Sequence, residues 1–155
     1  MKQLLIVFVL AAVLMGCGTQ ADSSSFSSVT GKEWRLIEVR IDTAFRREII
    51  FDRNSLTKEN ARDVFTLRFD NANMGGTAAP NRYNAPYSLG EDRQSITISP
   101  LRSTQMAALW QPERLRENDY YAYMQNVNRW ELANGRLILY SKNEEGHDVR
   151  LTYSN

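Results

Sequence analysis

The stretch that decides the fold is Trp130-Glu-Leu-Ala-Asn-Gly-Arg-Leu-Ile-Leu-Tyr140, in which the pair Asn134-Gly135 separates two apolar runs. Asn-Gly between apolar runs is the strongest short hairpin signal, because both residues accept the positive φ that a tight turn requires. A second turn at 144–146 precedes 149–153, where apolar and polar residues alternate as in a half-buried strand. Strands joined by such short turns are antiparallel, so this end of the chain predicts a three-stranded meander.

Further strands are expected upstream. The apolar residues of 65–69 and of 96–98 alternate with polar ones, which indicates strands with one buried face. Residues 34–41 alternate first in one phase and then in the opposite phase, which predicts a bulge or bend in one long strand. Residues 42–62 carry mixed charge with weak periodicity and predict an excursion with a short helical turn. Residues 71–76 predict a turn followed by two glycines that permit positive φ.

One amphipathic helix is expected after these strands. Pro112 suits a first helical turn, so the helix is expected to begin there. The members of its apolar face follow one another at helical intervals, namely Tyr120, Tyr123, Met124 and Val127. One such helix beside antiparallel strands predicts an α+β fold, a curved antiparallel β-sheet or small barrel with one covering helix.

The N-terminus resembles the export signal of a bacterial lipoprotein. The uncharged apolar run 4–15 is too short to span a bilayer and has the length of a signal-peptide core. It ends in Leu14-Met-Gly-Cys17, which resembles a lipobox; this motif implies cleavage before the cysteine and lipid on its sulfur. The expected parts are therefore a signal peptide over 1–16, lipidated Cys17 with a flexible Ser-rich tether over 17–28, and one folded domain over 29–155.

Charge and cysteine content restrict the partners of the mature chain. Removal of residues 1–16 takes away Lys2 and lowers the basic residues from 19 to 18, against 18 acidic ones. A neutral chain without a basic run argues against a nucleic-acid partner, whereas the lipid makes the membrane a partner. Gly18 rather than aspartate follows the cysteine, which in enteric bacteria favours the outer over the inner membrane of the cell envelope. Cys17 is the only cysteine, so no internal disulfide is expected.

Several pieces of the sequence resemble the META domain, the family of the heat-shock-inducible protein of enteric bacteria. They are Thr30-Gly-Lys-Glu-Trp-Arg-Leu36, Gly76-Thr-Ala-Ala-Pro-Asn-Arg-Tyr83, Ile96-Thr-Ile-Ser-Pro-Leu-Arg-Ser-Thr-Gln-Met-Ala107, Tyr120 through Gln125, and Asn134-Gly-Arg-Leu-Ile-Leu139. The resemblance implies a compact curved antiparallel sheet or small barrel with one packed helix. The resemblance further implies export, often as a lipoprotein. Some members are linked to stress tolerance, antibiotic resistance or virulence, and no catalytic reaction is established for the family.

A possible binding surface lies in two places. One is the rigid extended loop between Pro80 and Pro86, because function concentrates on ordered loops. The other is the part of the helix that lies off its apolar face. The candidate residues are Asn81, Arg82, Tyr83, Asn84 and Tyr121. The alternative for Asn81 is a structural role in which it bonds backbone groups at a turn.

No catalytic residue, metal ligand or cofactor is expected. The chain has one histidine, His147, whereas a hydrolytic triad needs a base beside its nucleophile and zinc usually takes more His or Cys ligands. We therefore expect a non-enzymatic binding module for an envelope protein or other envelope component. Two alternatives stay open. A carrier of a small apolar ligand inside the curved sheet predicts a cavity, and an uncharacterised hydrolase predicts titratable groups clustered in a cleft.

Overall fold

The computed structural model describes residues 25–60 and 63–155, so the predicted signal peptide, Cys17 and most of the predicted tether lie outside the described residues. One ten-stranded sheet has the order β6-β5-β4-β3-β1-β10-β9-β8, with β2 paired to β1 and β7 to β5. The strands are β1 (Glu33–Asp42), β2 (Arg47–Asp52), β3 (Thr66–Phe69), β4 (Asn73–Thr77), β5 (Arg82–Leu89), β6 (Ile96–Ile98), β7 (Arg102–Ser103), β8 (Arg129–Ala133), β9 (Arg136–Lys142) and β10 (Asp148–Ser154). The helices are α1 (Glu117–Gln125) and the 3-10 turns η1 (Phe26–Ser28) and η2 (Arg53–Ser55).

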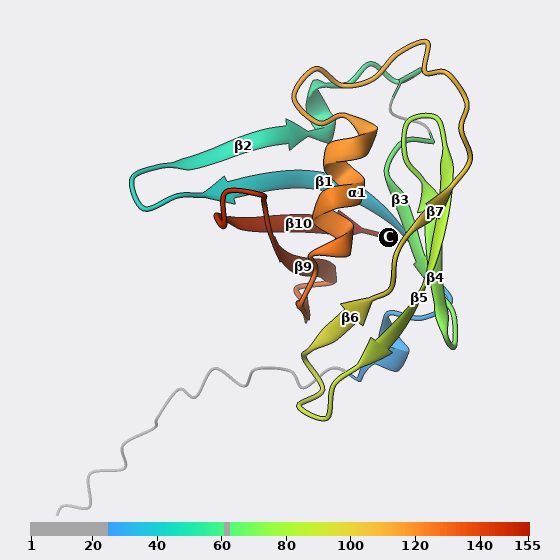
Figure 1. The fold of residues 1–155 in the computed structure, drawn as a ribbon, viewed down its shortest axis with the longest axis vertical. Helices are drawn as coiled ribbons and strands as arrows, with labels where there is room; N and C mark the ends of the chain where they lie inside the picture. The colour runs from blue at the N-terminus through green and yellow to red at the C-terminus, as the bar shows by residue number, and fades with distance from the viewer. Residues whose placement is uncertain (1–24, 61–62) are drawn as a thin grey trace, which may run out of the picture.

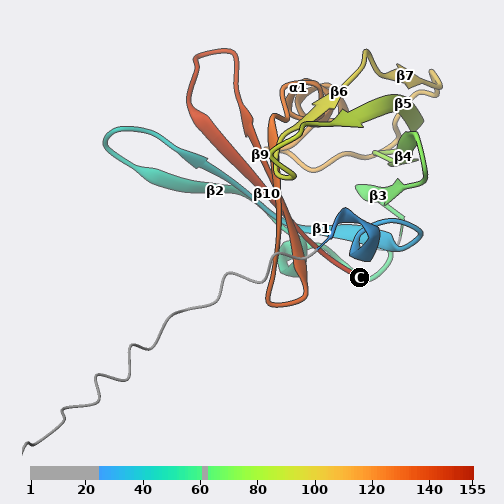
Figure 2. The same cartoon turned by 90° about the horizontal axis from the view of Figure 1, so that it is seen from below.

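The sheet bends around α1 (Figure 1). Seen from below, α1 lies between an arm that contains β9 and β10 and an arm that contains β3, β4 and β5 (Figure 2). Ser95, the residue before β6, forms one isolated antiparallel bridge with Arg129 of β8, but the two end strands of the sheet, β6 and β8, are not paired along a ladder. The sheet is therefore open, and the predicted α+β fold of a curved antiparallel sheet with one covering helix is confirmed.

Strand β1 contains the predicted bulge and connects the two arms. Its register with β10 shifts between Leu36 and Glu38. At the same place its other edge changes partner, from β3 along Glu33–Arg35 to β2 from Glu38 onward. A bulge increases the local twist, so one continuous strand can pair with strands that point in different directions.

The predicted C-terminal meander is also confirmed. β8 and β9 are joined by Asn134 at φ 52° and Gly135 at φ 72°, the positive values that the tight turn requires. β9 pairs with β10 over Leu137–Lys142, and the turn before β10 contains Gly146 at φ 82°.

The excursion at 42–62 contains a strand that the sequence did not predict. The expected helical turn is η2, but the residues before it form β2, which pairs with β1 as a hairpin. Of the six residues of β2 only Phe51 is buried, so the strand lacks the alternation by which a half-buried strand is recognised.

The two glycines predicted to follow a turn lie in strand β4. Neither Gly75 nor Gly76 has positive φ, so the conformational reason predicted for these glycines is wrong. Glycine is needed at both positions because the backbone of a neighbouring strand approaches too closely for a side chain. A Cβ on Gly76 would lie 1.9 Å from the Thr66 carbonyl oxygen, and one on Gly75 would lie 2.7 Å from that of Tyr83.

The helix begins at Glu117, five residues after the predicted start at Pro112. The side chains that accept hydrogen bonds from the first amides of the helix serve a start at Glu117 and not one at Pro112. The Asp119 carboxylate accepts from the Arg116 amide at 3.0 Å, and the Gln111 side-chain oxygen accepts from the Glu117 amide at 3.0 Å. Along 25–60 and 63–155, no helix is long and apolar enough to cross a membrane.

The folded domain begins earlier than predicted. The tether was expected to reach Ser28, but Phe26 is buried, with ring centroids 5.1, 5.5 and 4.8 Å from those of Phe69, Tyr87 and Trp130. An aromatic side chain that buries this much apolar surface fixes the backbone that carries it. The folded domain therefore includes Phe26, two residues before the predicted end of the tether.

Three tyrosine hydroxyls form a buried chain beneath α1. Tyr120 lies 2.8 Å from Tyr83 and 3.1 Å from Tyr153, and Tyr83 donates to the Thr66 carbonyl at 2.7 Å. Each hydroxyl has one hydrogen to donate. Donation from Tyr153 to Tyr120, from Tyr120 to Tyr83, and from Tyr83 to the carbonyl gives every hydroxyl an acceptor, so these polar groups can be buried without loss.

This chain predicts how the protein responds to alkali. Burial raises the pKa of Tyr120 to about 12, and burial also holds the pKa of Tyr83 and Tyr153 well above the ordinary 10.0. A pKa raised by folding contributes stability that is complete below the unfolded pKa and is lost as the pH rises through the folded one. We expect stability to fall from pH 10 upward and these tyrosinates to appear, by ultraviolet absorbance, only as the protein unfolds. Their ionisation near pH 10 with unchanged circular dichroism would contradict this.

Candidate functional site

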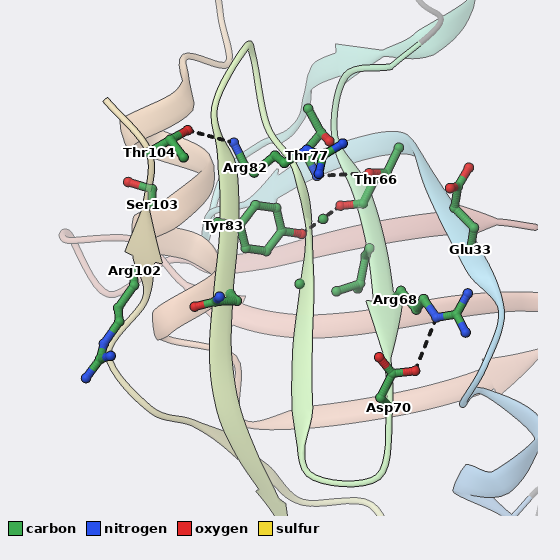
Figure 3. A pocket seen from close by; sticks show the side chains of 14 residues that line it. Glu33, Thr66, Arg68, Asp70, Thr77, Arg82, Tyr83, Arg102, Ser103 and Thr104 are labelled. Atoms are coloured by element: carbon green, nitrogen blue, oxygen red, sulfur yellow. Dashed lines mark hydrogen bonds and ion pairs between the residues drawn. The ribbon is translucent and has the colours of Figure 1, made fainter. Parts of the chain in front are cut away.

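A groove of about 630 Å³ crosses β3, β4, β5 and β7 on the outer face of the sheet (Figure 3). Strand residues alternate between the two faces, so the core side chains of these strands point away from the groove. Its polar and charged lining comprises Glu33, Thr66, Arg68, Asp70, Thr77, Arg82, Asn84, Arg102, Ser103 and Thr104, with Leu67, Gly75, Gly76 and Tyr83 completing it.

The register of the strands arranges this lining in rows. One row crosses five strands, each residue being the Cα partner of the next, in the order Glu33, Arg68, Gly75, Asn84 and Arg102. Side chains at such paired positions are close neighbours on one face. The row therefore brings two arginines, one carboxylate and one amide together from strands β1, β3, β5 and β7.

A parallel row is rich in hydroxyl groups. The Thr77 amide donates to the Thr66 hydroxyl at 2.9 Å, and Thr77 is the Cα partner of Arg82. The Arg82 amide donates to the Thr104 hydroxyl at 3.2 Å, and the Thr104 amide donates to the Arg82 carbonyl at 3.0 Å. These bonds extend the pairing of β5 with β7 by one residue and fix the wall of the groove.

Gly75 keeps the centre of the groove open. It stands between Arg68 and Asn84 in the first row and has no side chain to fill the space between them. A Cβ at Gly75 would also lie 3.4 Å from the Asn84 Cβ. The glycine therefore exposes backbone at the floor, where a ligand can approach closely.

The groove has an excess of positive charge. Arg68 pairs with Asp70 at 3.2 Å, both being exposed. Arg82 and Arg102 are exposed as well, and within 25–60 and 63–155 neither guanidinium group makes an ion pair or hydrogen bond. Figure 3 shows the Arg102 side chain directed away from the other arginines, at the β7 edge. Two cations are thus available to a ligand.

The structure separates the five residues predicted as a possible binding surface. Arg82 and Asn84 are exposed and line the groove. Asn81 and Tyr83 are each 4% exposed and their polar side-chain atoms bond inside the protein, so the prediction of exposed side chains is wrong for these two, although Tyr83 is among the residues that line the groove. Tyr121 is half-buried on α1, and burial raises the pKa of its hydroxyl. It does not line the groove.

Asn81 has the structural role that was its alternative. Its side-chain oxygen accepts from the Thr104 hydroxyl at 2.8 Å and from the Met106 amide at 2.7 Å. Its side-chain nitrogen donates to the Met106 carbonyl at 3.1 Å and to the Glu117 carboxylate at 2.7 Å. Asn81 therefore attaches the segment after β7 to the start of β5 and holds Thr104 in the groove wall.

Glu117 is the residue of this region that sequence reasoning missed. It is 8% exposed, and one carboxylate oxygen accepts from the backbone amides of Ala79 and Asn81 at 3.1 and 2.8 Å. A glutamate at a helix start is ordinarily explained by the helix dipole, so no signal in the sequence indicated burial.

The described part of the chain holds no group of three or more His, Cys, Asp or Glu side chains placed to bind a metal ion. His147 lies in the turn before β10, with its Nδ1 3.0 Å from the Glu145 carboxylate. It does not line the groove.

The fold and the groove define a single α+β domain, built on an open curved antiparallel sheet, with a polar cross-strand surface. The chain belongs to the META domain family, whose model matches residues 27–154. The resemblance inferred from the sequence is thereby confirmed, and the match begins within one residue of Phe26.

Known proteins add the fold but no activity. The chain is similar to an NMR structure of a protein from Burkholderia xenovorans, with a TM-score of 0.58 and 14% identity over 100% of this chain and 99% of that one. It is also similar to a crystal structure of a DUF4847 family protein from Bacteroides vulgatus, with a TM-score of 0.55 and 9% identity over 84% of this chain and 96% of that one. No protein of curated function matches it.

Proposed function

We propose that this META domain is a non-enzymatic binding module of the bacterial cell envelope, held by lipid on Cys17 at the outer rather than the inner membrane. Its ligand is an acidic segment of an envelope protein, bound in the groove across β3, β4, β5 and β7. The observation that carries this is the pair of exposed arginines, Arg82 and Arg102, which line a hydroxyl-rich groove without acidic partners. The role in stress tolerance or virulence that the family suggests is part of the proposal.

Binding rather than chemistry suits the groups in the groove. A nucleophile needs a base beside it, and none of the lining residues is a histidine. The carboxylates of Glu33 and Asp70 each pair with an arginine, at 3.1 and 3.2 Å. The Tyr83 hydroxyl is already bonded to the Thr66 carbonyl. This arrangement favours the binding module over the alternative of a hydrolase.

The apolar carrier is disfavoured because side chains occupy the concave face. Trp34, Phe65, Tyr120 and Tyr153 are at most 1% exposed there. The rings of Phe65 and Tyr120 have centroids 4.9 Å apart, and those of Phe51 and Phe65 5.3 Å. Aromatic rings packed at these distances leave no space for a ligand between them.

The anchor gives a first prediction. Replacing Cys17 with alanine removes the sulfur that accepts the lipid, so we expect the variant to leave the detergent phase of a Triton X-114 partition and to lose acyl labelling. Several acyl chains anchor a protein stably to a membrane, and a variant without acyl chains lacks this anchor. Ala11→Ser, within the same apolar run, is the control and should behave as the wild type. A Cys17→Ala variant that still partitions as a membrane protein would refute the anchor.

The groove gives a second prediction. In the double variant Arg82→Glu with Arg102→Glu, the yield of partner crosslinked by formaldehyde in cells should fall at least about tenfold, because like charges then face the acidic ligand. Arg136→Glu is the matched control, because Arg136 is exposed at the start of β9 and outside the groove. Equal yields from the double variant and the control would exclude the groove as the binding site.

A further inference from the structure

A second row of charged side chains crosses the other arm of the sheet, which Figure 2 shows opposite β3, β4 and β5. Arg40 of β1 is the Cα partner of Arg150 of β10, Arg150 that of Tyr140 of β9, and Tyr140 that of Arg129 of β8. We call these four residues the arginine row. They share a pocket of about 350 Å³.

The outer arginines of this row have partners. Arg40 pairs with Asp42 at 3.0 Å. The guanidinium carbon of Arg129 stacks 3.6 Å from the centroid of the Tyr140 ring, and one of its nitrogens lies 3.7 Å from Glu131. The Tyr140 hydroxyl donates to the same Glu131 carboxylate at 2.6 Å, so the ring and its cation are held in place.

Arg150, between them, has no counter-charge. Its Nε is shielded from solvent and has no acceptor, and across the described ranges its guanidinium group makes no ion pair. The two aspartates that line the pocket are already occupied. Asp42 is shared by Arg40 and Arg47, at 3.0 and 3.2 Å, and Asp148 pairs with Lys142 at 2.8 Å.

This arrangement is unfavourable without a ligand. Like charges directly opposite each other on neighbouring strands destabilise a sheet. A shielded donor without an acceptor loses its hydration without compensation. An arginine cannot relieve either cost by becoming neutral, because the guanidinium group keeps its proton in proteins. An anion with two or more oxygens would relieve both costs, since the guanidinium fork matches phosphate and carboxylate groups.

We therefore propose that the arginine row is a binding site for a small oxyanion, with phosphate as the preferred group and Arg150 as its main ligand. Arg40 and Arg129 flank the anion, and the stack on Tyr140 keeps the Arg129 side chain from folding away. The site is independent of the groove, which lies on other strands.

The test is phosphate binding to the lipidated chain in detergent micelles, measured by calorimetry at constant ionic strength with chloride as the replaced anion. We expect saturable binding, and Arg150→Gln should weaken it at least about tenfold, because charge-assisted hydrogen bonds to phosphate are lost. Arg136→Gln, at an exposed arginine outside the pocket, should bind as the wild type. Absence of saturable binding, or equal binding by Arg150→Gln and the wild type, would overturn the proposal.

Stability gives a second readout that does not depend on calorimetry. Without phosphate at low ionic strength, Arg150→Gln should melt at a higher temperature than the wild type, because the repulsion by Arg40 is removed. Addition of phosphate should raise the melting temperature of the wild type and of the control Arg136→Gln, but not that of Arg150→Gln. A variant that melts lower without phosphate and gains as much with it would also overturn the proposal.

Two soluble probes distinguish the source of the phosphate. Inorganic phosphate represents a free oxyanion, whereas glycerophosphoglycerol carries the phosphodiester of a lipid headgroup. Tighter binding of the first supports a free anion, and tighter binding of the second supports a headgroup. Either order of affinity supports the site, provided that Arg150→Gln binds the two probes equally weakly.

Discussion

Replacing Glu117 with alanine is expected to lower the free energy of unfolding by about 3–5 kcal/mol, because several buried donors lose their acceptor at once. The carboxylate accepts from the amides of Ala79 and Asn81 and from the Asn81 side chain, at 3.1, 2.8 and 2.7 Å. Each buried donor left without a partner costs about 1–3 kcal/mol, and alanine has no atom that can replace the acceptor. The loss is measured by urea denaturation followed by circular dichroism.

Two further variants make this test specific. Glu113→Ala removes an exposed glutamate nearby in the chain and should change the stability by less than about 0.5 kcal/mol. Glu117→Gln keeps one acceptor oxygen but brings an NH₂ group toward the same donors, so its loss should lie between the other two. If Glu117→Ala unfolds as easily as Glu113→Ala, the network does not hold the segment after β7.

The elements that the sequence predicted correctly rest on local signals. The turn at Asn134-Gly135 depends on two adjacent residues that accept positive φ, and the alternation of 65–69 depends on which side of one strand is buried. The bulge in β1 was visible because the phase of alternation reverses within the strand itself. Each of these signals lies within about ten residues, the length over which period and turn chemistry can be read.

The elements that were missed depend on contacts between distant residues. Gly76 resembles a turn glycine until its neighbour is known, and that neighbour is the Thr66 carbonyl on another strand. Glu117 and Asn81 are 36 residues apart, and their bond cannot be inferred from either residue alone. The helix start moved for the same reason, since Gln111 and Asp119 supply its caps, whereas Pro112 merely permits a start.

The candidate site was predicted in part. Arg82 and Asn84 were found because the stretch between the two prolines was interpreted as an ordered loop. That stretch forms part of strand β5, and both residues line the groove. Tyr83 belongs to the same stretch but is buried, as alternation along β5 requires, and Asn81, just before β5, is buried by its bonds to Thr104, Met106 and Glu117. Arg68 and Arg102 could not be assigned to the groove from sequence, because their places in the row depend on the order of strands β3, β4, β5 and β7.

Replacing Met124 with alanine should cost about 2–5 kcal/mol of unfolding free energy, because the side chain is fully buried between helix and sheet. Of the predicted apolar face, Tyr120 and Met124 of α1 are 0% exposed and Tyr123 is half-buried, whereas Val127, 4% exposed, lies two residues after the end of the helix. The Met124 sulfur lies 3.4 Å from the Tyr153 hydroxyl oxygen, so the helix contacts the hydroxyl chain as well as the apolar core. Alanine at this position would leave a cavity at the centre of the contact.

The neighbouring residue provides the control, because Gln125 is exposed one position further along the same helix. Gln125→Ala keeps or improves helix propensity and should change the unfolding free energy by less than about 0.5 kcal/mol. Both variants are compared with the wild type by chemical denaturation at neutral pH, where the tyrosines stay protonated. A loss below about 0.5 kcal/mol for Met124→Ala would mean that the helix does not cover the sheet in solution. Its apolar face would then be free to bind a partner, and the assignment of binding to the outer groove would lose its structural basis.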